Sequence, residues 1–589
     1  TPDMPEWARS LYANDEALNV FELDRLNKPW QLKYDSLRIE MANAGDTPGE
    51  ALRNEFEYYK KYQKYYIRWR ARVYPYMQQD GSIDFSIKLE KETPIPYLKS
   101  NTANWSFLGP VVTRWRQNDN AAQPLAPFQA NVYCLDVAPS NGNIVYCGTE
   151  TGVVNKSIDK GLTWTTVGAN VFTNNIGAIA IHPTNPDIVY VSEFSRYIRS
   201  TTDGGASWQT VLDISSFNCE DIKIKPDEPE VVLASGNSGL RRRTAGNVWT
   251  SVISSKTYDI AFQPGNPLVA YALVRNAGAD LCEFWKSTDG GQTWSVRSTG
   301  WISGAGFTDG GGRITVTPAA ADRIYCALLT GNGPRIMRSD DAGETWTVIA
   351  ASNQTGLIGP CTNGPLSMTN GQGFFDLSIV ASHDNADHII VGTTTSFKST
   401  DGGSTWATLG GYCGPFQIHP DIQEAIAHGT DTWIVTDGGL NLSTDFFTNP
   451  AVGVNYFVRT NNLRGSEHWG FDIGWNEDVV VGGRYHNGNT AWREGYPAGD
   501  YLRMGGGEAP TGYVNPGNNS LTYFSDLGGR ILPANNTQAV GSFTVSKWPN
   551  ESFYPMEGAE QKWDPRYMYT YYLGQGHQLW KTTDNGLSF

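Results

Sequence analysis

The chain has 589 residues and a formal net charge of −15, with 45 Lys and Arg against 60 Asp and Glu, so a phosphate-neutralising nucleic-acid surface is not expected. No apolar run is long enough to cross a membrane as a helix. The 63 Gly, 20 Trp and 29 Tyr, with only 18% charged residues, favour short strands and tight turns over long surface helices.

The first hundred residues differ from the rest. The segment "GEALRNEFEYYKKYQKYYIRWRARVYP" (49–75) places its apolar and aromatic residues at helical spacing, and Pro75 should end that helix. An earlier helix is expected within 4–34. We therefore predict an α-helical region over residues 1–104, with its aromatic side chains packed against the body of the protein. The chain begins with Thr1, which is consistent with removal of a signal peptide.

A short motif recurs along the remainder of the chain. "KSTDGGQTW" (286–294) and "KSTDGGSTW" (398–406) are nearly identical, and six segments fit S/T-x-D-x-G-x-S/T-W/F. Their aspartates are Asp159, Asp203, Asp289, Asp341, Asp401 and Asp584. Alternating strands joined by Pro/Asn/Gly turns precede the copies, as in "AIAIHPTNPDIVYVS" (178–192). Each unit is predicted to be a four-stranded sheet that packs radially against its neighbours, which predicts a β-propeller.

We count ten such units, which begin near Val132, Ile176, Glu220, Tyr258, Arg313, Phe375, Phe416, Trp469, Gly512 and Tyr554. The predicted fold is all-β, with two seven-bladed propellers over residues 105–450 and 451–589, and the change between them falls within 446–462. The last hairpin is interrupted at Phe589, so we expect the second propeller to be incomplete in this chain and the natural protein to continue. A single ten-bladed propeller is the alternative.

The repeated motif resembles the Asp-box, or BNR repeat, of sialidases, xyloglucanases and sortilin-type receptors. The resemblance implies that each motif lies in the hairpin between the third and fourth strands of a blade. Glycine permits positive φ in such a turn, the Asp carboxylate accepts hydrogen bonds from turn amides, and the Trp packs beneath. We therefore expect the six aspartates to be structural and not catalytic.

The order of several longer motifs carries a second resemblance. "YYIRWRARVYPYMQQDGSIDF" (65–85), "CGPFQIHPDIQ" (413–423), "VTDGGLNLSTDF" (435–446) and "VVVGGRYHNGN" (479–489) occur in an order that resembles large secreted propeller proteins of Bacteroidota. Those commonly leave the cell by type IX secretion, directed by a C-terminal sorting domain. The resemblance implies an extracellular or outer-surface location, with a surface protein or glycan as partner and the outer-membrane secretion machinery contacted through a domain outside this sequence.

Two segments of this chain match loops that often have a fixed sequence in that family. The segment matching "IHPDIQ" often reads His-x-Asp-x-His there, and the one matching "RYHNGN" often reads Gln-Asp-Asn-Gly. This chain has Gln423 at the second His position, and a His at the Asp position of the other loop. These departures remove ligands that a metal ion would need, so we expect no metal site and no cofactor. The candidate ligand-binding residues are His419, Asp421, His486, Asn487 and Trp492.

The sequence contains few indications of catalytic residues. A glycosidase needs two carboxylates across a cleft, and among many acids we prefer Asp472 and Glu467, beside Trp469. No nucleophile motif such as G-x-S-x-G is present. Our first expectation is therefore an exported, non-catalytic interaction or adhesion module. The alternatives are a polysaccharide-acting glycoside hydrolase with its site between two propellers, and a sortilin-like peptide-binding scaffold.

Seven cysteines are scattered along the chain without a CxxC pair. Cys134 and Cys147 flank a predicted hairpin turn and are candidates for a disulfide. The odd total leaves at least one thiol free.

Overall fold

The computed structural model describes residues 5–12, 18–44, 49–73, 76–84, 108–115, 125–168, 171–276, 281–302, 307–474, 477–506, 512–515, 518–524, 528–543, 561–563, 570–575, 578–584 and 588. The chain divides into two compact units, Thr1–Ser106 and Phe107–Phe589. None of the described helices combines the length and apolar character required to cross a bilayer.

The first unit is helical. Its helices are α1 (Glu6–Tyr12), α2 (Val20–Ala44) and α3 (Glu50–Val73), so α3 ends just before Pro75. Fully buried Trp7 packs edge-on against Tyr66, with ring centroids 4.9 Å apart. The Tyr66 hydroxyl donates to Asp24 at 2.5 Å. The aromatic side chains of α3 therefore pack within this unit, against α1 and α2.

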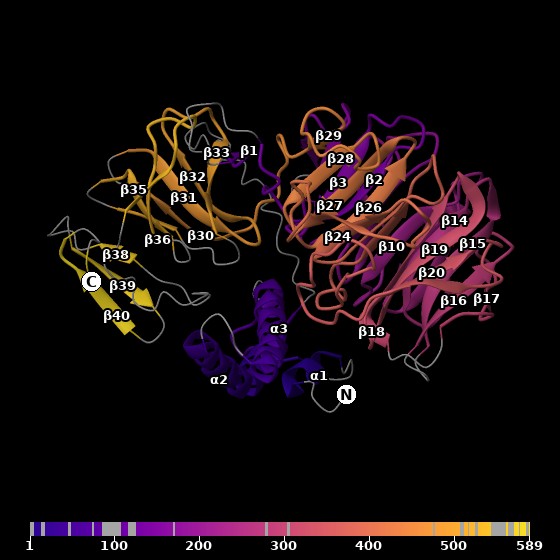
Figure 1. Ribbon diagram of the computed structural model, residues 1–589, viewed down its shortest axis with the longest axis horizontal. Coiled ribbons are helices and arrows are strands. Elements are labelled where there is room, and N and C mark those ends of the chain that lie inside the picture. The colour runs from indigo at the N-terminus through magenta and orange to yellow at the C-terminus, as the bar shows by residue number, and fades with distance from the viewer. Residues whose placement is uncertain are drawn as a thin grey trace. The chain divides into compact units, whose positions relative to one another are not determined.

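Seven four-stranded antiparallel sheets follow one another from Val132 to Val458 (Figure 1). The first four sheets are β2–β5 (Val132–Val137, Val145–Thr149, Val154–Ser157, Thr165–Val167), β6–β9 (Ile176–Ile181, Val189–Glu193, Tyr197–Thr201, Gln209–Asp213), β10–β13 (Cys219–Ile224, Val232–Gly236, Gly239–Thr244, Val248–Ile253) and β14–β17 (Thr257–Gln263, Asn266–Asn276, Leu281–Ser287, Ser295–Val296). The remaining three are β18–β21 (Phe307–Thr317, Ala320–Thr330, Arg335–Ser339, Thr347–Ala351), β22–β25 (Ser378–Ala381, Ile389–Gly392, Thr395–Ser399, Ala407–Gly411) and β26–β29 (Ile422–His428, Asp431–Thr436, Gly439–Ser443, Tyr456–Val458).

These seven sheets close a ring. The first strand of each sheet packs against the first strand of the next, and β26 packs back against β2. Leu135 and Trp164 of the first sheet share a buried cluster with Trp433 and Leu440 of the last. Because every sheet consists of consecutive strands, side-chain packing and not strand exchange closes the seven-bladed propeller.

Further sheets follow the ring and belong to a second propeller. They are β30–β33 (His468–Ile473, Val479–Arg484, Gly488–Arg493, Asp500–Gly505), β34–β37 (Gly512–Val514, Leu521–Phe524, Gly528–Ile531, Gly541–Phe543) and β38–β40 (Gln561–Trp563, Tyr571–Gln575, Gln578–Thr582). Strand β1 (Val112–Arg114), which precedes the ring in sequence, pairs in parallel with β33 (Figure 1). Arg114 also forms an ion pair with Asp500 at 2.7 Å. Strand β1, before the first propeller in sequence, and strands β30–β33, after it, therefore form one sheet of the second propeller.

The repeated motif forms the turn between the third and fourth strands of its sheets, as β24 and β25 illustrate. Asp401 accepts hydrogen bonds from the backbone N–H of Thr405 (2.9 Å) and from the hydroxyls of Thr405 (2.6 Å) and Ser399 (2.8 Å). Gly402 and Gly403 have φ of 70° and 94°, which only glycine adopts without strain. The Trp406 indole donates to the Gly403 carbonyl at 3.0 Å. One carboxylate therefore closes the whole turn.

The β-propeller fold is confirmed, while some predicted positions differ. The fifth, sixth and seventh sheets begin at Phe307, Ser378 and Ile422, and not at the expected Arg313, Phe375 and Phe416. Alternation in "FQIHP" is strand-like, but Phe416 and Ile418 enter the core from a loop. Strand β29 pairs with β28, so the first ring extends beyond the expected boundary at 450. The tenth predicted start, Tyr554, lies outside the described residues.

The expected Cys134–Cys147 disulfide is wrong. Cys147 pairs across the hairpin with Leu135, and Cys134 pairs with Gly148, so the two thiols point to opposite faces of one sheet. Cys134 packs in the cluster shared with the second sheet, and Cys147 in the cluster shared with the seventh. Both are buried free thiols.

Candidate functional site

The seven-bladed ring meets sheet β30–β33 through Arg484, the last residue of β31. Its side chain is fully buried and donates to the carbonyls of Phe128 (2.7 Å) and Gln129 (3.1 Å) and to the hydroxyl of Thr113 (3.0 Å). Burial, with Arg503 nearby, lowers the pKa of Arg484 to about 9. The guanidinium remains charged near neutral pH and fixes the adjoining β31–β32 turn against the first propeller.

That turn contains His486 and Asn487. The Asn487 amide donates to the side-chain oxygen of Asn131 (2.8 Å) and to the carbonyl of Asp437 (2.9 Å), both in the first propeller. His419 Nε2 lies 2.9 Å from the His486 carbonyl. Its Nδ1 lies 2.7 Å from the Pro420 carbonyl, and burial lowers the pKa of His419 to about 4. Strands distant in sequence thus hold one loop in place.

A group of titratable side chains lies beside this turn. Asp421 immediately precedes β26, Asp437 follows β27, and one candidate ligand atom from each lies within 4.8 Å of the other and of a His486 ring nitrogen. His486 Nε2 is 3.4 Å from Asp437 Oδ2. Asp421 and His486 have φ of 66° and 60°, a left-handed conformation that non-glycine residues seldom adopt. Such strain is typical of functional sites.

Asp376 completes the group. It lies two residues before the sixth sheet, its side chain is fully buried, and neither carboxylate oxygen accepts a hydrogen bond from an amide or hydroxyl group. Burial, together with the charges of Asp421 and Asp437, raises the pKa of Asp376 well above its usual value. We call Asp376, Asp421, Asp437 and His486 the buried acidic cluster.

Two half-buried glutamates flank the same junction. Glu150, in the β3–β4 turn, accepts a hydrogen bond from the Asn131 amide at 2.6 Å. Glu467, just before β30, accepts one from the Trp469 indole at 2.9 Å. The two segments are adjacent, because the Thr151 hydroxyl donates to the Gly465 carbonyl at 3.1 Å. One carboxylate from each propeller therefore lies where the two meet.

Trp469 also stacks on Tyr485, with ring centroids 4.3 Å apart and planes only 8° apart. Tyr485 itself is buried, whereas Trp469 is half-buried. Half-exposed aromatic faces beside carboxylates are suited to contact the apolar faces of sugar rings.

Other sequence-predicted residues lie apart from this constellation. Asp472, in β30, accepts a hydrogen bond from the backbone N–H of Val514 in β34 at 2.9 Å, and burial raises its pKa. It therefore links neighbouring first strands. Trp492 packs beside the core of the second propeller and donates to the Pro497 carbonyl. The junction brings together His419, Asp421, His486 and Asn487 of the predicted ligand-binding set.

Buried carboxylates also accept backbone hydrogen bonds between neighbouring first strands in the first propeller. Asp136 accepts from Ile181 N–H at 2.7 Å, and Glu424 accepts from Leu135 N–H at 2.7 Å. Burial raises the pKa of Asp136 to about 6 and that of Glu424 to about 8. These acids join neighbouring first strands around the ring, and Asp472 has the same relation to its neighbour in the second propeller.

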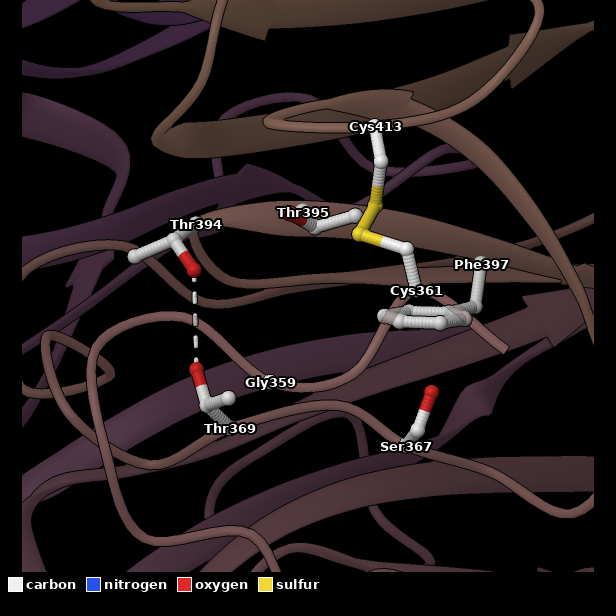
Figure 2. A pocket seen from close by; sticks show the side chains of 8 residues that line it. All are labelled: Gly359, Cys361, Ser367, Thr369, Thr394, Thr395, Phe397 and Cys413. Carbon is white, nitrogen blue, oxygen red and sulfur yellow. Dashed lines mark hydrogen bonds between the residues drawn. A yellow bond between two sulfur atoms is a disulfide. The ribbon is translucent and has the colours of Figure 1, made fainter. Parts of the chain in front are cut away.

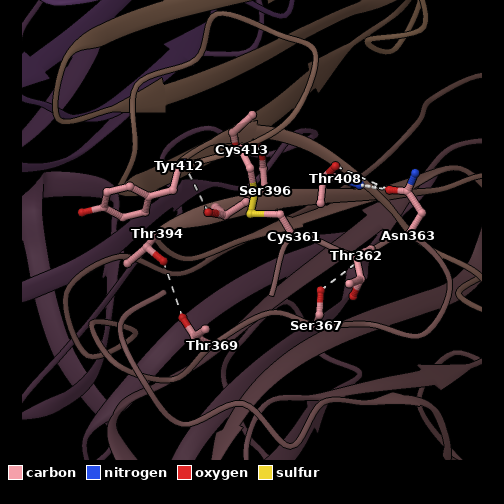
Figure 3. The surroundings of a disulfide bond; sticks show 12 residues. Cys361, Thr362, Asn363, Ser367, Thr369, Thr394, Ser396, Thr408, Tyr412 and Cys413 are labelled. Atoms are coloured by element: carbon pink, nitrogen blue, oxygen red, sulfur yellow. Dashed lines mark hydrogen bonds between the residues drawn. A yellow bond between two sulfur atoms is a disulfide. The ribbon is translucent and has the colours of Figure 1, made fainter. Parts of the chain in front are cut away.

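A pocket elsewhere adjoins the disulfide between Cys361 and Cys413 (Figure 2). The disulfide joins the loop before the sixth sheet to the loop after β25 (Figure 3). Nearby, Asn363 accepts a hydrogen bond from Thr408 N–H at 3.0 Å. The lining side chains leave essentially no room for a bound molecule. This pocket is therefore not a polysaccharide site.

No protein-family model matches the chain. The chain is 27% identical over 211 residues to the xyloglucanase of Hypocrea jecorina (strain QM6a), a match that spans 31% of this chain and 24% of that protein. Among solved structures, the GH74 enzyme of Niastella koreensis has a TM-score of 0.46 at 15% identity, covering 80% of both chains. The GH74 xyloglucanase of Xanthomonas campestris has a TM-score of 0.46 at 13% identity, covering 80% of this chain and 81% of its own.

The similarity to an enzyme that acts on a polysaccharide overturns the expected non-catalytic adhesion module.

Sequence reasoning passed over three residues at the junction. Glu150 and Asp437 lie in turns and Asn131 directly precedes a strand, positions without a distinctive sequence pattern, and Asp437 stands in "TDGG", which imitates the repeated motif. A usable signal was present: Asp437 precedes the third strand of its sheet, whereas every motif aspartate follows the third strand.

Proposed function

We propose that the protein is a secreted glycoside hydrolase acting on a β-glucan of the xyloglucan class. The observation that carries this proposal is the 27% identity over 211 residues to a xyloglucanase. The match spans 24% of that enzyme, so the substrate is assigned by class.

The junction contributes the chemical groups that the reaction needs. Hydrolysis of a glycosidic bond requires one carboxylic acid to protonate the leaving oxygen and one carboxylate as base or nucleophile. We propose Glu150 and Glu467 for these roles, since they come from different propellers and lie on adjacent segments. Trp469 would supply a stacking face for a sugar ring. Asp472 is less suited, because its carboxylate joins two strands.

Location and family follow as parts of the same proposal. A disulfide between Cys361 and Cys413 supports an oxidising, extracellular compartment. The hydrogen-bonded turns of Asp159, Asp203, Asp289, Asp341, Asp401 and Asp584 support assignment of the repeats as structural Asp-boxes. We retain type IX secretion as the export route and a cell-surface glycan as the partner.

The test is a hydrolysis screen of the purified chain on xyloglucan, mixed-linkage glucan and cellulose, read by release of reducing ends. We expect turnover of xyloglucan, and its loss in Glu150→Gln and Glu467→Gln. Glu494→Gln, an exposed change in the connection between β32 and β33, is the matched control and should keep full activity. Absence of turnover on all three polysaccharides would contradict the proposal.

An activated aryl β-glucoside as substrate distinguishes the general acid from the base or nucleophile. Its leaving group needs no protonation, so the variant that lacks the general acid should regain activity on it, while the other variant should not. Equal loss in both variants on both substrates would argue against this pair as acid and base.

A further inference from the structure

The buried acidic cluster combines side chains from both propellers. Asp376, Asp421 and Asp437 belong to the first and His486 to the second, and none is more than 6% exposed. The nearest ligand atoms of Asp421, Asp437 and His486 all lie within 4.8 Å of one another. Such convergence of oxygen and nitrogen donors is characteristic of a cation site.

The carboxylates are oriented by neighbouring amides. Gln372 Nε2 donates to Asp421 Oδ1 at 2.9 Å, and Gln423 Nε2 donates to Asp437 Oδ1 at 2.7 Å. The other oxygen of Asp437, Oδ2, faces His486 Nε2 at 3.4 Å. Hydrogen bonds from outer residues to one oxygen are the usual means of orienting a ligand carboxylate toward a metal.

Asp376 is an independent indication of a missing positive charge. Both of its oxygens are buried with no neighbouring amide or hydroxyl donor, and the side chain that faces it most closely is another carboxyl, that of Asp421. Its nearest charges are the carboxylates of Asp421 and Asp437. Three carboxylates in a buried space are stable only if a cation or protons compensate them.

We propose that the cluster binds one divalent cation, with Asp421, Asp437 and His486 as its ligands and the buried Asp376 carboxylate as a neighbouring negative charge. A mixed set of carboxylates and one imidazole suits Mn²⁺ or Zn²⁺, whereas Ca²⁺ takes oxygen ligands only. The ion would join the two propellers across the β31–β32 turn. From the His-x-Asp-x-Gln sequence we expected no metal site, since Gln423 replaces a possible ligand. In the structure Gln423 instead orients Asp437, a ligand that lies outside that motif.

The site goes beyond the proposed hydrolase activity and is tested without substrate. The full chain is stripped with a chelator, dialysed and titrated with Mn²⁺ and, separately, with Zn²⁺. Binding is read by calorimetry, metal content by elemental analysis and stability by thermal unfolding. We expect one equivalent of one of these ions per chain and a rise in Tm on loading, because the ion binds only the folded site.

Variants define the ligands. Asp437→Asn and His486→Gln should abolish stoichiometric binding and the rise in Tm, and Gln423→Leu should weaken binding by about tenfold. Asp384→Asn, an exposed change between the first two strands of the sixth sheet, is the matched control and should bind as the natural chain does. If Asp437→Asn fails to fold, His486→Gln and Gln423→Leu carry the test.

Three results would overturn the proposal. The first is that the chain binds less than one equivalent of either ion after loading, which would mean that protons compensate the negative charge of the carboxylates. Another is binding that survives both Asp437→Asn and His486→Gln. The third is preference for Ca²⁺ with no dependence on His486. Because none of these readouts uses hydrolysis, failure here and failure of the proposed function are distinguishable.

Discussion

Arg484 of the second propeller donates through Nη1 to the backbone carbonyl of Gln129 in the segment preceding the first blade, at 3.1 Å, with both residues fully buried. The contact joins positions 355 residues apart in sequence. It makes the junction of the two propellers part of the folded core.

Loss of this guanidinium should destabilise the junction. Arg484→Met keeps the length of the side chain but leaves the carbonyls of Phe128 and Gln129 without this donor, and a buried group without a partner costs about 1–3 kcal/mol. We expect a lower urea midpoint and earlier proteolysis between the propellers. Arg196→Met, which removes an exposed ion pair with Asp213, should change stability far less. Equal effects of both substitutions would contradict the structural role of Arg484.

The turn carboxylates should affect stability and not activity. Asp401→Ala removes three hydrogen bonds from the turn between β24 and β25, and we expect a loss of about 1 kcal/mol with hydrolysis unchanged. Asp384→Asn, an exposed change between the first two strands of the same sheet, is the control. Loss of activity at an unchanged melting curve would show that Asp401 has a functional role.

The pH dependence of that turn has a defined sign. The Thr405 and Ser399 hydrogen bonds lower the pKa of Asp401 to about 2. A carboxyl whose pKa is lower in the folded chain stabilises the fold above its unfolded pKa of about 4, and that contribution is lost as pH falls toward 2. The natural chain and Asp401→Ala should therefore converge in Tm between pH 4 and pH 2, as measured by calorimetry. A constant difference in Tm over this range would contradict the assignment.

Glu424 should produce the opposite pH dependence. Burial raises its pKa to about 8, so the folded chain binds this proton more tightly than the unfolded chain, whose pKa is about 4. The free energy of unfolding then falls as pH rises between these values. Glu424→Gln should lose less Tm than the natural chain between pH 5 and pH 8, while exposed Glu494→Gln should behave like the natural chain. Parallel losses in all three proteins would argue against a raised pKa of Glu424.

The disulfide should stabilise the sixth sheet. Cys361 and Cys413 are 52 residues apart, and a cross-link over such a loop typically contributes about 2–4 kcal/mol. We expect reduction, or replacement of both residues by Ser, to lower the denaturation midpoint by a corresponding amount. Thiol titration of the unfolded chain should give five free thiols before reduction and seven after it. Seven thiols without reductant would exclude the disulfide.

The sequence alone determined the architecture. Six copies of a turn motif and period-two strands predict four-stranded units, since glycine at positive φ, a turn-closing Asp and a packed Trp are local requirements that any copy must meet. The same locality explains the errors: Phe416 and Ile418 alternate like a strand but enter the core from a loop, and Cys134 and Cys147 flank a turn yet face opposite sides of the sheet.

Only the tertiary structure decided the candidate site. Glu150 and Glu467 are more than three hundred residues apart, and Asp376 and His486 more than a hundred, so no linear spacing relates them. Closure of the ring brings the segment before β22 and the turns of β3–β4 and β27–β28 to the junction, where contacts with the β31–β32 turn complete the site. Because these contacts are long-range, burial and hydrogen bonding, not local sequence pattern, distinguish the junction acids from the carboxylates that close turns and join strands.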